Sequence, residues 1–294
     1  MSDNFADRLL AAIAAKGSPV CVGLDPTLGN LPAAVVANSR GPVQAVEAFC
    51  MGLIEAVAPI VPAVKPQSAY FEALGPEGVA VYFRVVAAAK QAGLIVIGDV
   101  KRNDIGSTAE AYAAGHLAGP DAADAVTVNG YLGADGIEPF VKVARETGRG
   151  LFVLVRTSNP SAAAIQDFAS ADGRKLYEHM AAQVAAIGST EGLVGASGYS
   201  CVGAVVGATW PAQARELRAM MPRQIVLVPG YGAQGASAAD CAASFKPDRT
   251  GAIVNASRSV IFAHTRKEYA GLEWRQAVAA AARGFASDIS GALP

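Results

Sequence analysis

Three charged residues lie close together in residues 98–106, which read GDVKRNDIG. Asp99 and Lys101 are two positions apart at the end of an apolar run, so both side chains are expected on one face of a strand. Asp104 follows in the next loop. A lysine near carboxylates keeps its proton, and can therefore stabilise and then protonate a carbanion. A carboxylate fixed beside a substrate carboxylate repels it until CO2 leaves. The pair therefore suits decarboxylation followed by protonation.

The same residues also allow a structural interpretation, in which Asp99 and Lys101 form a salt bridge and Asp104 caps the following helix. Asp25 and Lys65, at the ends of two other apolar runs, favour the catalytic interpretation. Bringing several carboxylates and ammonium groups together costs desolvation energy. Such clusters are where perturbed pKa values and catalysis occur.

Eight short apolar runs indicate how these residues are positioned. The runs are continuous rather than alternating, as in strands buried on both faces of a parallel sheet. Ala-rich segments with helical periodicity, such as 78–92 and 211–221, lie between them. This order predicts an α/β protein, a single-domain (β/α)8 TIM barrel formed by residues 1–294. The predicted strands are residues 19–24, 60–65, 94–100, 124–129, 150–156, 202–207, 224–229 and 251–256.

Three segments extend this minimal barrel. The long connections 26–58 and 157–201, after strands 1 and 5, lack the low complexity of linkers, so they are predicted to be insertions with helices of their own. Near the N-terminus, Phe5, Leu9 and Ile13 have helical spacing and predict an extra short amphipathic helix.

Every predicted strand except the sixth is followed by a polar residue or a glycine loop. Active sites of (β/α)8 barrels lie at the C-terminal ends of the strands. Charged residues make up only 17% of the chain, so chance does not explain their regular occurrence there. These strand-end positions are Asp25, Lys65, Asp99 with Lys101, Asn129, Thr157 with Ser158, residues 230–235, and Ser257 with Arg258.

The glycine loop contains a literal G-x-G-x-x-G formed by Gly230, Gly232 and Gly235. A dinucleotide-binding interpretation is disfavoured because the motif follows the seventh strand and no ribose-binding acid lies about 20 residues further on. A phosphate loop, completed by Ser257 and Arg258 after strand 8, matches the usual phosphate site of such barrels. Glycines that merely allow tight turns remain the alternative.

Composition excludes several classes of function. The formal net charge of −1 provides no basic stripe for nucleic acid. No apolar run approaches the ~18–20 residues needed to span a bilayer. Four cysteines without a CxxC pair indicate reduced thiols and a cytoplasmic protein. Three scattered histidines, none at a strand end, argue against zinc and His-triad mechanisms.

Several segments together resemble the orotidine 5′-phosphate decarboxylase (OMP decarboxylase) family, and most of all its longer bacterial branch. DVKRNDI matches the DxKxxD signature of that family, and the resemblance covers nearly the whole chain. The other matching segments are VGLDP at 22–26, VKPQ at 64–67, VRTSNP at 155–160, PGYGAQG at 229–235 and NASRSVIFA at 255–263.

The resemblance implies a cofactor-free, metal-free homodimer that decarboxylates OMP to UMP. It implies that Asp25 and Lys65 bind the ribose, and that Asp99 and Lys101 carry the chemistry. Asp104 is implied to reach the neighbouring subunit's site together with Thr108, a role that the local spacing does not show. The remaining implied substrate contacts are Ser158 at the pyrimidine edge, and Gln234, Arg258, Ser257 and Gly232 at the phosphate.

Two alternative functions remain open at this point. Phosphosugar decarboxylases and synthases of the same superfamily share the signature of the third strand but require Mg²⁺. Those relatives have a glutamate at the end of strand 2, where Lys65 stands here and would repel a cation. The second alternative is a catalytically silent barrel that binds a nucleotide or a partner protein.

Overall fold

Eight parallel strands form a closed barrel in the computed structural model, which describes residues 4–294. The strands pair in chain order, and β8 closes the barrel against β1. The predicted (β/α)8 barrel is therefore confirmed. The strands are β1 (Val20–Leu24), β2 (Ala63–Pro66), β3 (Ile95–Arg102), β4 (Ala125–Val128), β5 (Gly150–Arg156), β6 (Ser200–Val206), β7 (Gln224–Val228) and β8 (Ala252–Ala256).

The strands coincide with the apolar runs because both of their faces are buried. β1, β6, β7 and β8 are buried along their full length, which explains why their sequences do not alternate. The prediction was wrong at the start of β2, which begins at Ala63 rather than at residue 60. Residues 60–62 instead belong to the turn and bend before the strand, and Pro62 has no N–H to donate to a ladder.

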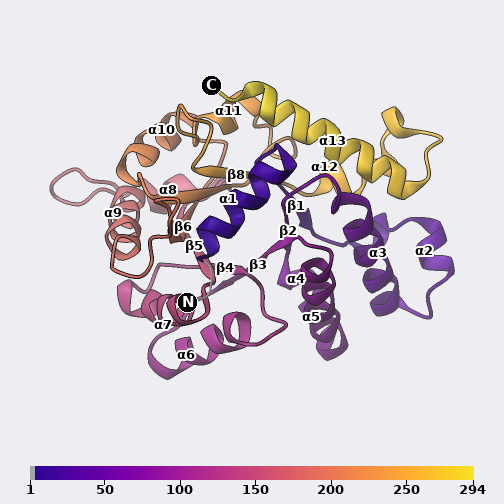
Figure 1. Ribbon diagram of the computed structural model, residues 1–294, viewed down its shortest axis with the longest axis horizontal. Helices are drawn as coiled ribbons and strands as arrows, with labels where there is room; N and C mark the ends of the chain where they lie inside the picture. The colour runs from indigo at the N-terminus through magenta and orange to yellow at the C-terminus, as the bar shows by residue number, and fades with distance from the viewer. Residues whose placement is uncertain (1–3) are drawn as a thin grey trace.

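Helices surround the barrel (Figure 1). Residues 78–92 and 211–221 form helices as predicted, with slightly shifted ends. The helices that follow the strands are α4 (Ser68–Glu72), α5 (Gly75–Gln91), α6 (Gly106–Ala113) with the π-helical turn η2 (Ala114–Ala118), α7 (Ala134–Thr147), α10 (Pro211–Met220), α11 (Ala238–Ala242), α12 (Arg258–Ile261), the short turns η3 (Ala263–Thr265) and η4 (Lys267–Tyr269), and α13 (Trp274–Ala292).

Both predicted insertions contain helices. Between β1 and β2 lie η1 (Leu28–Asn30), α2 (Ala33–Ala37) and α3 (Pro42–Val57), and the apolar face of α3 is buried. Between β5 and β6 lie α8 (Ala162–Gln166) and α9 (Leu176–Gly188). The insertion after β5 begins at the active-site end of the barrel, so its first residues can take part in the site.

The predicted N-terminal helix, α1 (Phe5–Lys16), closes the opposite end of the barrel. The ring of Phe5 packs edge-to-face on Phe152, with 5.8 Å between centroids. Arg8 pairs with Asp124 immediately before β4, with 2.6 Å between Nη1 and Oδ1. In Figure 1, α1 crosses in front of the strands. The N-terminal end is thus filled, and the C-terminal ends of the strands remain open.

All four cysteines are buried and free, as expected for reduced thiols. In residues 4–294, no helix combines the length and the apolar character needed to cross a bilayer. His116 lies in η2, where its ring stacks on Phe83.

Candidate active site

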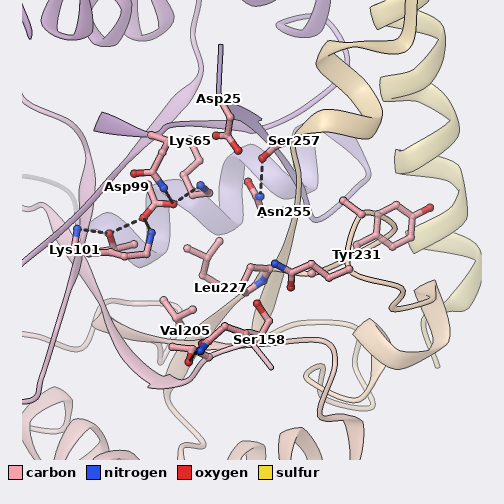
Figure 2. A pocket seen from close by; sticks show the side chains of 18 of the residues that line it. Asp25, Lys65, Asp99, Lys101, Ser158, Val205, Leu227, Tyr231, Asn255 and Ser257 are labelled. Atoms are coloured by element: carbon pink, nitrogen blue, oxygen red, sulfur yellow. Dashed lines mark hydrogen bonds and ion pairs between the residues drawn. The ribbon is translucent and has the colours of Figure 1, made fainter. Parts of the chain in front are cut away.

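A cavity of about 420 Å³ opens at the C-terminal ends of the strands. Every strand, or the loop directly after it, contributes to its wall. Figure 2 shows charged residues gathered on one side of the cavity and Ser158 on another. The residues predicted for the site that line this cavity are Asp25, Lys65, Asp99, Lys101, Ser158, Gln234, Ser257 and Arg258.

The carboxylate of Asp99 lies at the centre of the charged side. The Nζ atoms of Lys65 and Lys101 each lie 2.5 Å from one of its oxygens, Oδ2 and Oδ1 respectively. The side chains of Gln67 and Thr127 each donate a further hydrogen bond of 3.0 Å to the same carboxylate. Four donors from three neighbouring strands therefore fix the orientation of Asp99.

This arrangement keeps the central charges ionised. Burial by itself raises the pKa of Asp99, but the nearby charges and hydrogen bonds of Lys65 and Lys101 outweigh it and hold that pKa well below its usual range. Burial likewise lowers the pKa of Lys65, while Asp99 and Asp25 raise it, so the pKa of Lys65 lies above its usual value. Both residues are charged at neutral pH.

Asp99 and Lys101 meet, but strand alternation is not the whole reason. Lys101 has a φ of 45°, in the left-handed region that is uncommon for a residue with a side chain. The pairing of β3 with β4 shifts register between Gly98 and Arg102. The N–H of Lys101 donates to Thr127 Oγ1 at 2.9 Å instead of to a strand partner. This bulge directs the lysine, which is half-exposed, into the cavity.

Two buried oxygen atoms on the same side have no partner in residues 4–294. They are Oδ1 of Asp25, at the end of β1, and Oδ1 of Asn255, in β8. Buried polar atoms are normally paired. Because both residues line the cavity, these atoms are available to a polar ligand such as a sugar hydroxyl.

The glycine loop after β7 and the start of α12 form another part of the wall. Gly230, Gly232 and Gly235 have φ values of 108°, 67° and 87°, which glycine adopts without strain. Gln234 and Arg258 face the cavity from these two segments. A guanidinium, an amide and a flexible loop can bind an anionic group together. Gly232 itself does not line the cavity, so its visible role is to shape the loop.

Ser158 reaches the cavity because a glycine, Gly207, directly follows β6. A Cβ added to Gly207 would lie 2.8 Å from the Cβ of Ser158. The sixth strand, which carries no polar residue at its end, therefore provides the space that the serine from the neighbouring strand occupies.

Comparison with known proteins identifies the family. A model of the orotidine 5′-phosphate decarboxylase / HUMPS family matches residues 18–271. The chain belongs to this family. Among its relatives, orotidine 5′-phosphate decarboxylases of Rhodopirellula baltica and Deinococcus radiodurans are 48% and 44% identical to it. These alignments cover 95% and 90% of this chain, and 96% and 91% of the respective relatives.

Solved structures agree with this assignment. A structure of Leishmania donovani OMP decarboxylase matches the chain with a TM-score of 0.78 and 31% identity, and the match covers 98% of each chain. A crystal structure of a Streptomyces avermitilis protein assigned to the same family matches with a TM-score of 0.83 and 38% identity, over 99% of this chain and 96% of the other.

Besides Gly232, two of the residues that the family resemblance implied, Asp104 and Thr108, lie outside the cavity of this family member. Asp104 is half-buried, and its Oδ1 accepts a hydrogen bond from the N–H of Ile105. Asp104 is not the cap of α6, because the N-cap position is Ile105. Thr108 is exposed on α6. Asn129, also at a strand end, does not line the cavity, and its Oδ1 accepts the N–H of Tyr131.

Sequence reasoning missed five polar residues that line the cavity in this family member, and one of them, Asn159, directly follows the predicted Ser158. Thr127 and Asn255 were visible as polar residues inside otherwise apolar strands, which is a usable signal in a barrel core. Gln67 follows Lys65 by two positions and therefore could have been placed on its face. The fifth residue is Tyr231, which lies inside the strand-end loop 230–235, although that loop was assigned to its glycines and Gln234 only.

The donor set of the site does not suit a divalent cation. The Asp99 carboxylate contacts two ammonium groups, and residues 4–294 contain no group of three or more His, Cys, Asp or Glu side chains that could hold a metal.

The charged cluster predicts a pH dependence of stability. The folded pKa of Asp99 lies below its unfolded value of about 3.9. Its stabilising contribution is therefore present above that value, and is lost as pH falls toward the folded pKa. For Lys65 the folded pKa is raised, so its contribution is fully present below about pH 10.4 and is lost only at higher pH.

We therefore expect Asp99→Asn to lower the free energy of unfolding by about 3 kcal/mol at pH 7, because Lys65 loses its buried partner. The deficit should shrink below about pH 4. Denaturant unfolding at several pH values measures it. Glu47→Gln, in an exposed pair with Arg84, is the control and should change stability by less than about 1 kcal/mol. A deficit that stays constant in acid would contradict the low pKa of Asp99.

Proposed function

We propose that this chain decarboxylates orotidine 5′-phosphate to UMP in pyrimidine biosynthesis. The observation that carries the proposal is the array of Lys65, Asp99 and Lys101, which places one buried carboxylate and one accessible ammonium side by side on the wall of a closed-bottomed cavity. The family match and the names of the relatives support the same reaction.

The chemistry requires the C6–carboxylate bond to break while its electron pair stays on C6. Asp99, held ionised, repels the substrate carboxylate, and this repulsion disappears when CO2 departs. Lys101 stabilises the developing carbanion by its charge and then transfers a proton from Nζ to C6. The resulting neutral amine recovers a proton from water. The products are UMP and CO2.

Other wall residues orient the substrate. Asp25 and Lys65 bind the ribose hydroxyls, which would satisfy the unpaired Oδ1 of Asp25. Ser158 contacts the edge of the pyrimidine ring. Gln234 and Arg258 bind the phosphate, together with Ser257 and the loop that Gly232 shapes. The half-exposed Lys101 then lies nearest the reacting carbon.

The family also includes phosphosugar enzymes, so membership alone does not fix the substrate. Lys65 separates the two activities, because its ammonium, 2.5 Å from Asp99, stands where a Mg²⁺ site would need an oxygen ligand. We therefore propose a reaction without metal or organic cofactor. A barrel that only binds nucleotides is disfavoured because the positioned Asp99–Lys101 pair is not required for binding.

We further propose a homodimer in which Asp104 completes the partner's site. Four large apolar side chains are exposed on the loops and helix around Asp104 and Thr108: Ile105, Tyr112, Tyr131 and Leu132. Exposed apolar side chains grouped in this way are typical of an interface. The cavity of about 420 Å³ has the size of a small-molecule site. We propose no nucleic-acid or membrane partner.

We also propose that residues 1–294 form one domain and that the enzyme acts in the cytoplasm. All four thiols are free and buried, which fits a reducing compartment. Residues 1–3 of the proposed domain lie outside the described part of the chain.

Turnover of OMP tests the proposed function directly. We expect OMP to be converted to UMP with unchanged rate after exhaustive treatment with EDTA, because lysine ammonium groups supply the electrostatic stabilisation. Loss of OMP in the ultraviolet spectrum measures the rate, and a phosphosugar substrate with Mg²⁺ serves as the comparison. Activity abolished by EDTA and restored by Mg²⁺ would reject the cofactor-free reaction.

Arg258→Ala tests the phosphate end of the site. We expect kcat/KM for OMP to fall about 100-fold, since charge-assisted hydrogen bonds to a dianion are lost, and added guanidinium ion should restore part of the activity. Arg84→Ala removes an exposed arginine on α5 and should leave kcat/KM unchanged. Unchanged kinetics in Arg258→Ala would rule out Arg258 as the phosphate ligand.

Mixing two inactive variants tests the shared site. Under subunit exchange, Lys101→Ala and Asp104→Ala chains form hybrids in which one site carries both defects and the other carries neither. An equal mixture should regain about a quarter of wild-type activity, because half of the dimers are hybrids with one intact site. Exchange is verified with tagged chains. No recovery despite verified exchange would place Asp104 in its own subunit's site.

A further inference from the structure

A fully buried arginine ends β5 directly beside the active site. Arg156 is 0% exposed, and the next two residues, Thr157 and Ser158, line the cavity. Its guanidinium lies between two aromatic rings, 4.1 Å from the ring centroid of Trp210 and 4.8 Å from that of Tyr177. Nothing in the proposed reaction uses this charge, so its presence needs another explanation.

The insertion after β5 supplies the only carboxylate that pairs with Arg156 in residues 4–294. Asp167, just after α8, places Oδ1 2.8 Å from Nη1 of the arginine. The preceding residue, Gln166, accepts the N–H of Thr157 at 3.0 Å and donates to its Oγ1 at 2.7 Å. Two consecutive residues of the insertion thus hold Arg156, which ends β5, and Thr157, which follows it.

The aromatic partner Trp210 also contacts the strand end. Its Nε1 donates a hydrogen bond of 2.9 Å to the carbonyl oxygen of Thr157. The carbonyl oxygen of Arg156 accepts the N–H of Gly207, the glycine that makes room for Ser158. The elements around Arg156 therefore converge on the backbone that carries Ser158.

Stability alone does not account for this arrangement. Burying an ion pair costs desolvation energy, and an apolar residue of similar size often gives an equally stable core. In residues 4–294 none of the guanidinium nitrogens has a partner in hydrogen-bond geometry, so its contacts are the ion pair and the two rings. A planar guanidinium held by an ion pair and two rings has a fixed orientation as well as a fixed position.

We propose that Arg156 is a positioning residue that sets how the active site recognises the base of its nucleotide. It ties residues 157–167 to the barrel and so holds Ser158 against the pyrimidine edge. This inference rests on the proposed function, because it takes a pyrimidine nucleotide as the ligand. Arg156 does not touch that ligand, and acts through Ser158.

The expected signature is a loss of affinity that depends on the base. UMP contacts Ser158, whereas ribose 5-phosphate lacks the base and contacts only the sugar and phosphate residues. We expect Arg156→Met to weaken UMP binding about tenfold, roughly one hydrogen bond, and to leave the affinity for ribose 5-phosphate unchanged. Arg84→Met is the matched control, because its guanidinium pairs with Glu47 on the exposed surface.

A double-mutant cycle tests whether the effect passes through Ser158. If it does, Arg156→Met in a Ser158→Ala background should cause less than about a twofold further loss of UMP affinity, because coupled residues are not additive. Two milder variants guard against misfolding. Asp167→Asn removes the paired charge, and Trp210→Phe keeps a ring but loses the donor to Thr157. Both should shift UMP binding in the same direction as Arg156→Met.

Calorimetric titration of UMP and ribose 5-phosphate into the full-length wild type and each folded variant decides the matter. Selective loss of UMP affinity that disappears in the Ser158→Ala background supports the positioning role. Equal loss for both ligands, full additivity with Ser158→Ala, or wild-type UMP affinity in the folded variants overturns it. The proposed function is judged separately, by OMP turnover and UMP binding of the wild type.

Discussion

The buried carboxylate of Asp99 is the constraint on which the active site depends. A charge removed from water costs several kcal/mol unless other groups replace the lost hydration. Lys65 and Lys101 supply two ammonium groups, and Gln67 and Thr127 supply two further donors. Because these residues come from β2, β3 and β4, the cluster exists only in the closed barrel, and folding and assembly of the charged site are one event.

The two lysines of this cluster differ in what they can do. Lys65 is buried with a side-chain exposure of 6%, so its charge serves to hold Asp99. Lys101 is 46% exposed and projects into the cavity from a left-handed backbone position. Its exposure leaves space for a substrate carbon. A strained backbone at Lys101, the residue proposed to face the reacting atom, fits the concentration of such conformations at functional sites.

The repeated order of strand and helix could be predicted because each strand is apolar on both faces, and all eight were found. The residues that meet at the barrel mouth followed from this order, since each strand end points to the same side. The bulge at Lys101 could not be foreseen, because it depends on a hydrogen bond to Thr127 from the neighbouring strand. The contacts of Arg156 were equally hidden. They join β5, the insertion and Trp210, which are separated by up to 54 positions, and no local pattern encodes them.

The most direct test of the account compares the affinity of a UMP analogue with negative charge at C6 in the wild type and in Lys101→Ala, alongside turnover of OMP. If Lys101 stabilises the carbanion and protonates it, the wild type should bind the anionic analogue far more tightly than UMP. In Lys101→Ala this preference should collapse, and turnover should fall by more than the ~10⁴-fold upper range of proton transfer alone. Near-wild-type turnover, or an unchanged preference for the anionic analogue, would contradict the central role assigned to Lys101.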